Sequence, residues 1–190
     1  MNTRRIICTL LGMWIGASLF MASVAAFSFR VVNELILNPV PEMAPYLKVL
    51  SSEKIRLLAR FQAAEFNRTL FEGWGLAQIL LGLLIFGILL FGTKEGKLIL
   101  GLSLFMVLLS TGMHLLITPS IIGYGKTLDF VAAEKEPELR RRVQAFHNAY
   151  SAMEGVKLLC GAGLLVILFR EVRKRPGRND EGGTEDLEAA

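Results

Sequence analysis

Three stretches of this 190-residue chain carry no charged side chain over about 20 or more positions each. They run from Ile6 to Phe29, from Gly73 to Gly92 and from Leu98 to Gly125. A helix rises about 1.5 Å per residue, so each run is long enough to cross the hydrocarbon core of a bilayer, about 30 Å thick. Runs of this length in so short a chain predict an integral membrane protein.

A fourth span is expected near the carboxyl end, although its uncharged part, Leu158 to Phe169, is too short to cross a bilayer. Extending that helix outward to about residue 146 gives the required length and takes Glu154 and Lys157 into the membrane. A short buried or re-entrant helix is the alternative. We favour a full span, because its inner end would meet an abrupt basic cluster: Arg170, Arg173, Lys174 and Arg175.

The fold class predicted from these runs is all-α, a polytopic four-helix membrane bundle. Its single domain covers residues 1–170, with spans at about 6–29, 71–92, 98–120 and 146–169. An outer amphipathic helix is expected at about 51–68, running into the second span, with Ser51 or Ser52 as its amino cap and Glu53 in its first turn. Residues 171–190 are expected to form a disordered cytoplasmic tail, because from Pro176 on the sequence turns to Gly, Asp and Glu without periodicity.

Four spans place both termini on one side of the membrane. Arg4, Arg5, Lys94 and Lys97 lie on that side together with the basic cluster, which predicts that the termini are cytoplasmic. The expected location is the inner (plasma) membrane of a bacterial-type cell. An alternative for the first span is a secretory signal cleaved after Ala26. Expected partners are the lipid bilayer and a membrane protein or a second copy of the chain; the net charge of +4 lies in loops and tail and does not indicate nucleic acid.

An internal repeat is visible in the sequence. The segment "RFQAAEFNRTLFEGWGL" from Arg60 aligns without gaps on "RVQAFHNAYSAMEGVKL" from Arg142, and "GASLFM" from Gly16 matches "GLSLFM" from Gly101. Chance similarity between apolar helices explains the shorter match alone. Both matches together predict two copies of a two-span hairpin, and an even number of spans per copy makes the copies parallel.

Several polar side chains fall at neighbouring depths in the predicted spans. From the helix rise, His114 lies about 24 Å and Glu154 about 22 Å from the inner ends of their spans. Tyr150 and His147 lie one and two turns above Glu154 on the same helix face. These side chains predict an outward-opening polar pocket, with two more charged residues near its mouth: Glu72 and Arg30.

Three interpretations of this pocket are open. In the structural one, Glu154 pairs with Lys157 or another base and His114 bonds a neighbouring carbonyl. In the second, His114, His147 and Glu154 hold a transition metal such as zinc or copper, or the two imidazoles ligate haem iron; their depths differ by about 10 Å, which counts against it. The third is a path for transport or proton relay.

No motif in the sequence indicates catalysis. It contains no nucleophile elbow, phosphate loop, HExxH or paired CxxC, and Cys8 and Cys160 both fall in apolar segments. We therefore expect a small non-enzymatic bundle, with no catalytic residues, that acts in transport, binding or membrane-protein assembly. A haem- or metal-binding membrane protein is the alternative.

The segments "HLLITPSIIGYG" and "RRRVQAFHNAYSAMEGVKLL" resemble the uncharacterised four-span family of transmembrane protein 205 and its bacterial relatives. The matching positions are Pro119, Arg142, Phe146, His147 and Glu154. The resemblance covers roughly residues 10 to 170. It implies a four-helix membrane domain and no established chemistry.

Overall fold

The computed structural model describes residues 3–38, 41–42, 45, 51–93, 96–131 and 135–173. The predicted tail lies outside the described residues from position 174 on, and so does Lys94. The described residues form helices and no strand, and four of the helices are long and apolar enough to cross a membrane. The prediction of an all-α protein with four candidate membrane spans is therefore confirmed.

The first candidate span is α1, Thr3–Leu37, and the second is α3, Ser52–Gly92. The third is continuous from Lys97 to Thr127. It consists of α4 (Lys97–Gly112), the π-helical turn η1 (Met113–Ile117) and α5 (Thr118–Thr127). The fourth is α6, Pro137–Arg173. Each helix is longer than the predicted span, because charged and polar residues continue it beyond the apolar run.

The second and fourth helices begin at residues suited to a helix start. Ser51 is the amino cap of α3, where its side chain accepts a hydrogen bond from the Lys54 backbone N–H at 3.4 Å. The predicted amphipathic helix is present and is continuous with the second span. Pro137 opens α6, a position at which the missing proline N–H has no helical partner to lose.

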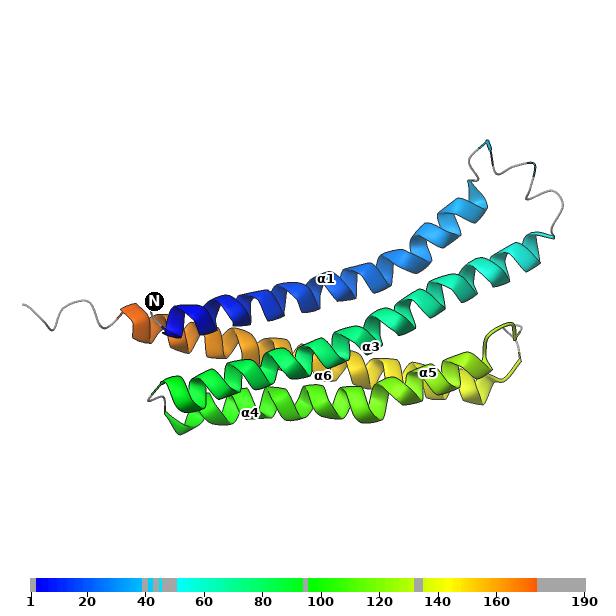
Figure 1. Cartoon of the computed structure of the whole chain (residues 1–190). Coiled ribbons are helices and arrows are strands. Elements are labelled where there is room, and N and C mark those ends of the chain that lie inside the picture. Colours follow the sequence, from blue (N-terminus) through cyan, green and yellow to red (C-terminus); the bar gives the residue numbers. More distant parts are fainter. Residues whose placement is uncertain are drawn as a thin grey trace, which may run out of the picture.

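Neighbouring helices run antiparallel around a ring (Figure 1). Along the ring α1 packs on α3, α3 on α4, α4 on α6, and α6 back on α1. We call the end at which α1 begins and α6 finishes the terminal end, and the opposite one the loop end. Toward the loop end, α1 and α3 curve away from α5 and α6 in Figure 1.

The core of the bundle is apolar and lies toward the terminal end. Its members come from all four spans: Ile7, Leu11, Trp14, Ile85, Leu89, Ile99, Met106, Leu164 and Leu168. The outer surface is apolar too, with Phe91 87% and Leu159 75% exposed. Soluble monomers rarely expose apolar surface on this scale, whereas lipid chains would cover it. Apolar side chains inside and outside are consistent with a multi-pass integral membrane protein.

Candidate functional site

A lysine is buried in the middle of the bundle. The Lys157 side chain is 1% exposed, and both Glu154 carboxylate oxygens lie 2.7 Å from its Nζ. Nζ donates a hydrogen bond to Glu154 Oε2 and another to Gln78 Oε1, and it lies 5.5 Å from the centre of the Trp14 ring. A buried charge is tolerated when it is paired and hydrogen-bonded, as it is here. The ion pair that the structural interpretation of Glu154 predicted is present.

Gln78 links Lys157 by hydrogen bonds to Trp14 of α1 and to Tyr150 of α6. Its Oε1 atom also accepts a hydrogen bond from Trp14 Nε1 at 3.4 Å, and a side-chain hydrogen bond links it to Tyr150. Gln78 is 2% exposed. It was not among the predicted site residues, although it is the only amide in the uncharged run from Gly73 to Gly92, and that could have identified it.

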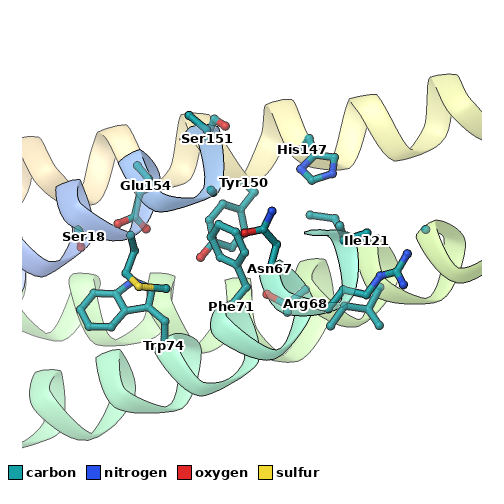
Figure 2. Close-up of a pocket in the computed structure, with 18 of the residues that line it drawn as sticks. Ser18, Asn67, Arg68, Phe71, Trp74, Ile121, His147, Tyr150, Ser151 and Glu154 are labelled. Carbon is teal, nitrogen blue, oxygen red and sulfur yellow. The ribbon is translucent and has the colours of Figure 1, made fainter. Parts of the chain in front are cut away.

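A cavity of about 600 Å³ lies beside this polar group, and residues of α1, α3, α5 and α6 line it (Figure 2). Its lining extends from Ser18 and Leu158, near the middle of the bundle, to Phe29 and Val143 toward the loop end. Small and aromatic side chains form much of the wall. The polar members of the lining are Ser18, Asn67, Arg68, His147, Tyr150, Ser151 and Glu154. Lys157 itself is not one of the lining residues.

Three of the six predicted pocket residues line this cavity: His147, Tyr150 and Glu154. The aromatic ring of Tyr150 meets that of Phe71 edge to face, with ring centres 5.5 Å apart. The other three lie elsewhere. Glu72 and Arg30 are exposed side chains outside the lining, and His114 is partly buried against α3.

His114 lies in η1, the π-helical turn of the third span. The Thr118 hydroxyl donates to the Met113 carbonyl, five residues back, at 3.0 Å. Pro119 follows, and it has no N–H with which to close the ordinary helical hydrogen bond, so a local irregularity is expected there. The imidazole faces Gly75: a Cβ atom at that glycine would lie 2.4 Å from His114 Nδ1. Within the described residues this nitrogen has no hydrogen-bond partner.

The predicted metal ligands do not form one cluster. His147 and Glu154 share the cavity, whereas His114 faces α3. Across the part of the chain that the structure describes, no three His, Cys, Asp or Glu side chains come close enough to hold a metal ion. The haem or metal alternative stays a prediction that this geometry does not favour.

The cavity-lining side chains include two buried polar atoms that have no partner among the described residues: Ser18 Oγ and Asn67 Oδ1. Glu154 Oε1 accepts no hydrogen bond there either, but it lies 2.7 Å from Lys157 Nζ in the ion pair. Ser18 is 3% and Asn67 8% exposed. Buried polar atoms nearly always have a partner, so two such atoms in the residues of one cavity leave hydrogen-bonding capacity for a polar occupant.

The orientation of the Asn67 amide follows from its neighbours. The Ser28 hydroxyl donates to the Ala25 carbonyl at 3.0 Å, so its oxygen accepts the second hydrogen bond, from Asn67 Nδ2 at 2.7 Å. The Asn67 oxygen is therefore the atom left without a partner. This asparagine belongs to the sequence "NRT", a glycosylation pattern that its burial against α1 makes inaccessible.

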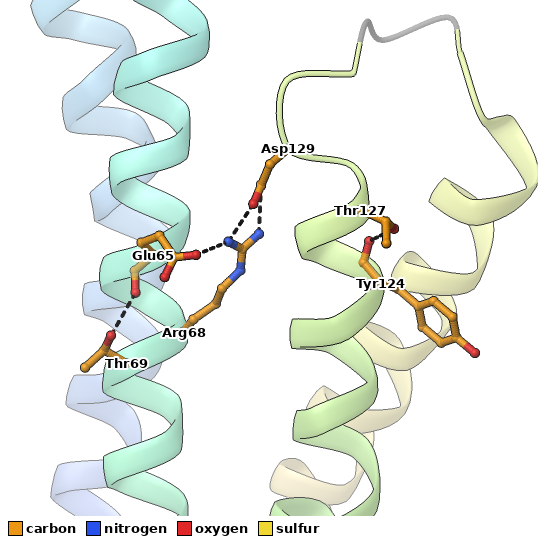
Figure 3. Close-up of polar contacts among 6 residues, drawn as sticks. All are labelled: Glu65, Arg68, Thr69, Tyr124, Thr127 and Asp129. Carbon is orange, nitrogen blue, oxygen red and sulfur yellow. Dashed lines mark hydrogen bonds and ion pairs between the residues drawn. The ribbon is translucent and has the colours of Figure 1, made fainter.

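An ion pair joins α3 to the end of the third span near the loop end (Figure 3). Arg68 Nη1 and Nη2 each donate to one carboxylate oxygen of Asp129 at 2.8 Å, and Nη1 also donates to Glu65. The Arg68 and Asp129 side chains are only 11% and 15% exposed. A bidentate, largely buried pair of this kind is stronger than a surface ion pair.

Arg68→Gln should lower the free energy of unfolding by about 1–2 kcal/mol, because it leaves the largely buried Asp129 carboxylate without its partner. Circular dichroism of the detergent-solubilised protein, with unfolding driven by increasing dodecyl sulfate, measures it. Arg141→Gln is the matched control. The Arg141 side chain is 81% exposed, and its distance of 3.9 Å to the Glu138 carboxylate is long for an ion pair. Equal effects of the two changes would contradict a stabilising role for the Arg68 pair.

Comparisons of the chain with family models, with curated proteins and with solved structures gave no match. The resemblance to the transmembrane protein 205 family therefore stays a prediction from the quoted motifs. The class that the fold and site define is a multi-pass membrane bundle with an internal cavity beside a buried ion pair.

Proposed function

We propose that this protein is a non-enzymatic membrane protein that binds a small amphiphilic molecule in its internal cavity, as the binding step of transport across, or uptake from, the plasma membrane. The observation that carries the proposal is the cavity itself. Its volume, about 600 Å³, lies within the range of about 300–1,000 Å³ typical of small-molecule sites. Its wall combines apolar side chains with a few unpartnered polar atoms, the usual composition of such a site.

The charged groups of the lining support binding over catalysis. Glu154 is engaged by Lys157, and Arg68 by Asp129 and Glu65, so both act as fixed charges. A general acid or base must be able to exchange its proton at a reacting group. An assembly subunit, the other predicted role, would use the outer helix faces, and it would not need a cavity lined by helices from every span.

A substitution that narrows the cavity should weaken the binding of an amphiphilic molecule there. The probe is 8-bromo-1-octanol, whose bromine quenches tryptophan fluorescence on contact, and the chain has two tryptophans, of which Trp74 lines the cavity. In nanodiscs we expect a saturable component of quenching above the linear background from probe in the lipid. Ala25→Phe places a ring in the cavity wall and should weaken that component by about tenfold or more, the equivalent of losing about 1.4 kcal/mol of binding.

The control is Ala152→Phe, which adds the same ring to an exposed position of α6 outside the lining. It should leave the saturable component unchanged. Quenching that is linear in probe concentration for the wild type and for both variants would overturn the proposal, because it would report only partition into lipid.

A further inference from the structure

We infer that the ligand of this cavity is a single-chain lipid of the surrounding bilayer, which enters sideways between α1 and α6 and lies with its head group toward the loop end. The inference rests on the proposed binding function and specifies the class of the ligand and its route. It starts from the place where the cavity opens.

The exposure of the lining residues locates this opening. Five of them are exposed, and all of these belong to α1 or α6: Ala22, Ala26, Phe29, His147 and Ser151. Every lining residue from α3 and α5 is buried or half-buried. The cavity therefore opens where α1 faces α6. We call the gap between these five side chains the lateral opening.

The opposite side of the cavity, between α3 and the end of the third span, is closed by side-chain contacts. The Arg68 guanidinium forms its bidentate ion pair with Asp129 there. The centres of the Phe61 and Phe130 rings lie 5.0 Å apart. These contacts leave the lateral opening as the side on which the helices are least connected.

The contacts between α1 and α6 lie toward the terminal end. A Cβ atom at Gly161 would lie 3.5 Å from Ile15 Cδ1. Lys157 lies over the Trp14 ring. From Ser18 to Phe29, the described side chains of α1 form hydrogen bonds within α1 or with α3, and none with α6. The two helices are thus held together at the terminal end of the cavity and not along it.

The lateral opening faces lipid. Exposed apolar side chains continue on both helices, at Phe20, Phe27 and Val31 of α1 and at Val156 and Leu159 of α6. Apolar surface of this extent on a candidate span is covered by lipid chains. A molecule dissolved in the bilayer therefore reaches the opening directly, whereas one arriving from water has to cross the apolar surface first.

The cavity has the length of one lipid chain. From Ser18 to Phe29 the lining follows α1 for about 16 Å, at a rise of about 1.5 Å per residue. The chains of one leaflet span about 15 Å, half of a hydrocarbon core about 30 Å thick. The small side chains of Ala22, Ala25 and Ala26 leave room for a chain along this wall.

Asn67 indicates the orientation of the lipid. Its side chain is bonded to Ser28, next to Phe29, so it lies in the loop-end part of the cavity, and Figure 2 shows it well separated from Ser18. Asn67 is 8% exposed, and its Oδ1 atom has no partner among the described residues. An amide oxygen only accepts hydrogen bonds, so it favours a head group that carries a hydroxyl or another donor. A polar head is also less costly near the membrane surface than at the depth of Ser18.

Photocrosslinking in nanodiscs tests the inference. The probe is a monoacylglycerol, a single-chain lipid with a hydroxyl-bearing head, that carries a diazirine. Ser18 and Asn67 are buried lining residues, so the probe reaches them from the cavity. Leu159 is 75% exposed and serves as the internal reference for labelling from bulk lipid. A diazirine at the chain end should label Ser18, and one beside the head group should label Asn67.

Substitutions at the lateral opening should reduce this labelling. Ala26→Phe places a ring in the opening from α1, and Ser151→Phe places one from α6. Each should lower the labelling of Ser18 relative to that of Leu159 by about fivefold or more. Ala152→Phe adds the same ring at an exposed position outside the lining and should leave the ratio unchanged.

The possible failures are distinguishable. Labelling confined to Leu159, with saturable quenching by 8-bromo-1-octanol retained, would overturn the lipid and leave the binding function standing. Equal labelling of Ser18 in Ala26→Phe, Ser151→Phe and Ala152→Phe would overturn the lateral route. Labelling of Ser18 by the diazirine beside the head group, in place of the one at the chain end, would overturn the orientation. Loss of both interior labelling and saturable quenching in the wild type would overturn the binding function as well.

Discussion

Lys157→Met should lower the free energy of unfolding by about 3–5 kcal/mol, the largest effect expected of any single substitution in this chain. Methionine keeps the length of the side chain but removes the ammonium. The Glu154 carboxylate, only 14% exposed, is then left without its counter-charge, and the Gln78 oxygen loses its strongest donor. Equilibrium unfolding in mixed micelles with increasing dodecyl sulfate, followed by circular dichroism, measures the change.

Two further variants distinguish loss of the Lys157–Glu154 ion pair from a nonspecific effect of replacing lysine by methionine. Lys97→Met removes an exposed lysine at the start of α4 and should leave stability within about 0.5 kcal/mol of the wild type. The double variant Lys157→Met/Glu154→Gln should recover at least half of the loss, because it removes the unpaired charge as well. A single Lys157→Met variant as stable as the Lys97→Met control would show that the pair is solvated and not buried in the bundle.

The fold could be predicted from the sequence because one pattern determines it. The length of the uncharged runs sets the number of spans, and the structure has helices at all the predicted places. The helix ends were predicted less well. The length of an uncharged run follows the thickness of the hydrocarbon core and not the length of the helix. Helices such as α1 and α6 continue past the run through charged residues that water can solvate.

The site could be predicted only in part, since helix rise gives the height of a residue but not the direction of its side chain. His147, Tyr150 and Glu154 share a face of α6 and line the cavity, as their spacing within one helix indicated. His114 and Glu72 belong to other helices, whose rotation about their own axes depends on packing. The His114 imidazole faces Gly75, and the Glu72 side chain is exposed. The Glu72–Glu154 repeat pair thus differs in surroundings, and the duplication stays a prediction.

Neutral polar residues were missed for a different reason. Gln78 was missed because the predicted site was built mainly from ionisable side chains. An amide in hydrocarbon also requires hydrogen-bond partners, and Gln78 has them. Asn67 was not among the predicted site residues either, and its side chain donates a hydrogen bond to Ser28, 39 residues away along the chain. The Arg68–Asp129 pair is separated by 61 residues, and no local pattern in the sequence indicates which acid an outer arginine will meet.

Gly75→Ala should lower the free energy of unfolding by about 2–3 kcal/mol, toward the upper end of the usual cost of overpacking. The added Cβ would lie 2.4 Å from His114 Nδ1 and 3.1 Å from its Cγ, so either the imidazole must leave its rotamer or α3 and η1 must separate. Helix propensity acts in the opposite direction, since alanine is favoured over glycine in a helix by about 1 kcal/mol, and the measured loss is net of that gain. Unfolding by dodecyl sulfate, as for Lys157→Met, measures the difference.

Gly73→Ala, two residues away on the same helix, is the matched control, because a Cβ there meets nothing within 4 Å. It should leave stability unchanged or slightly raised. The double variant Gly75→Ala/His114→Ala provides the decisive comparison: removing the ring removes the clash, so the alanine at position 75 should cost nothing in that background. If Gly75→Ala is equally destabilising with and without His114, the close approach of the imidazole to α3 is not what requires glycine. If the two changes cancel as expected, the contact between η1 and α3 fixes the rotation of the third span, and with it the separation of His114 from the cavity that Glu154 lines.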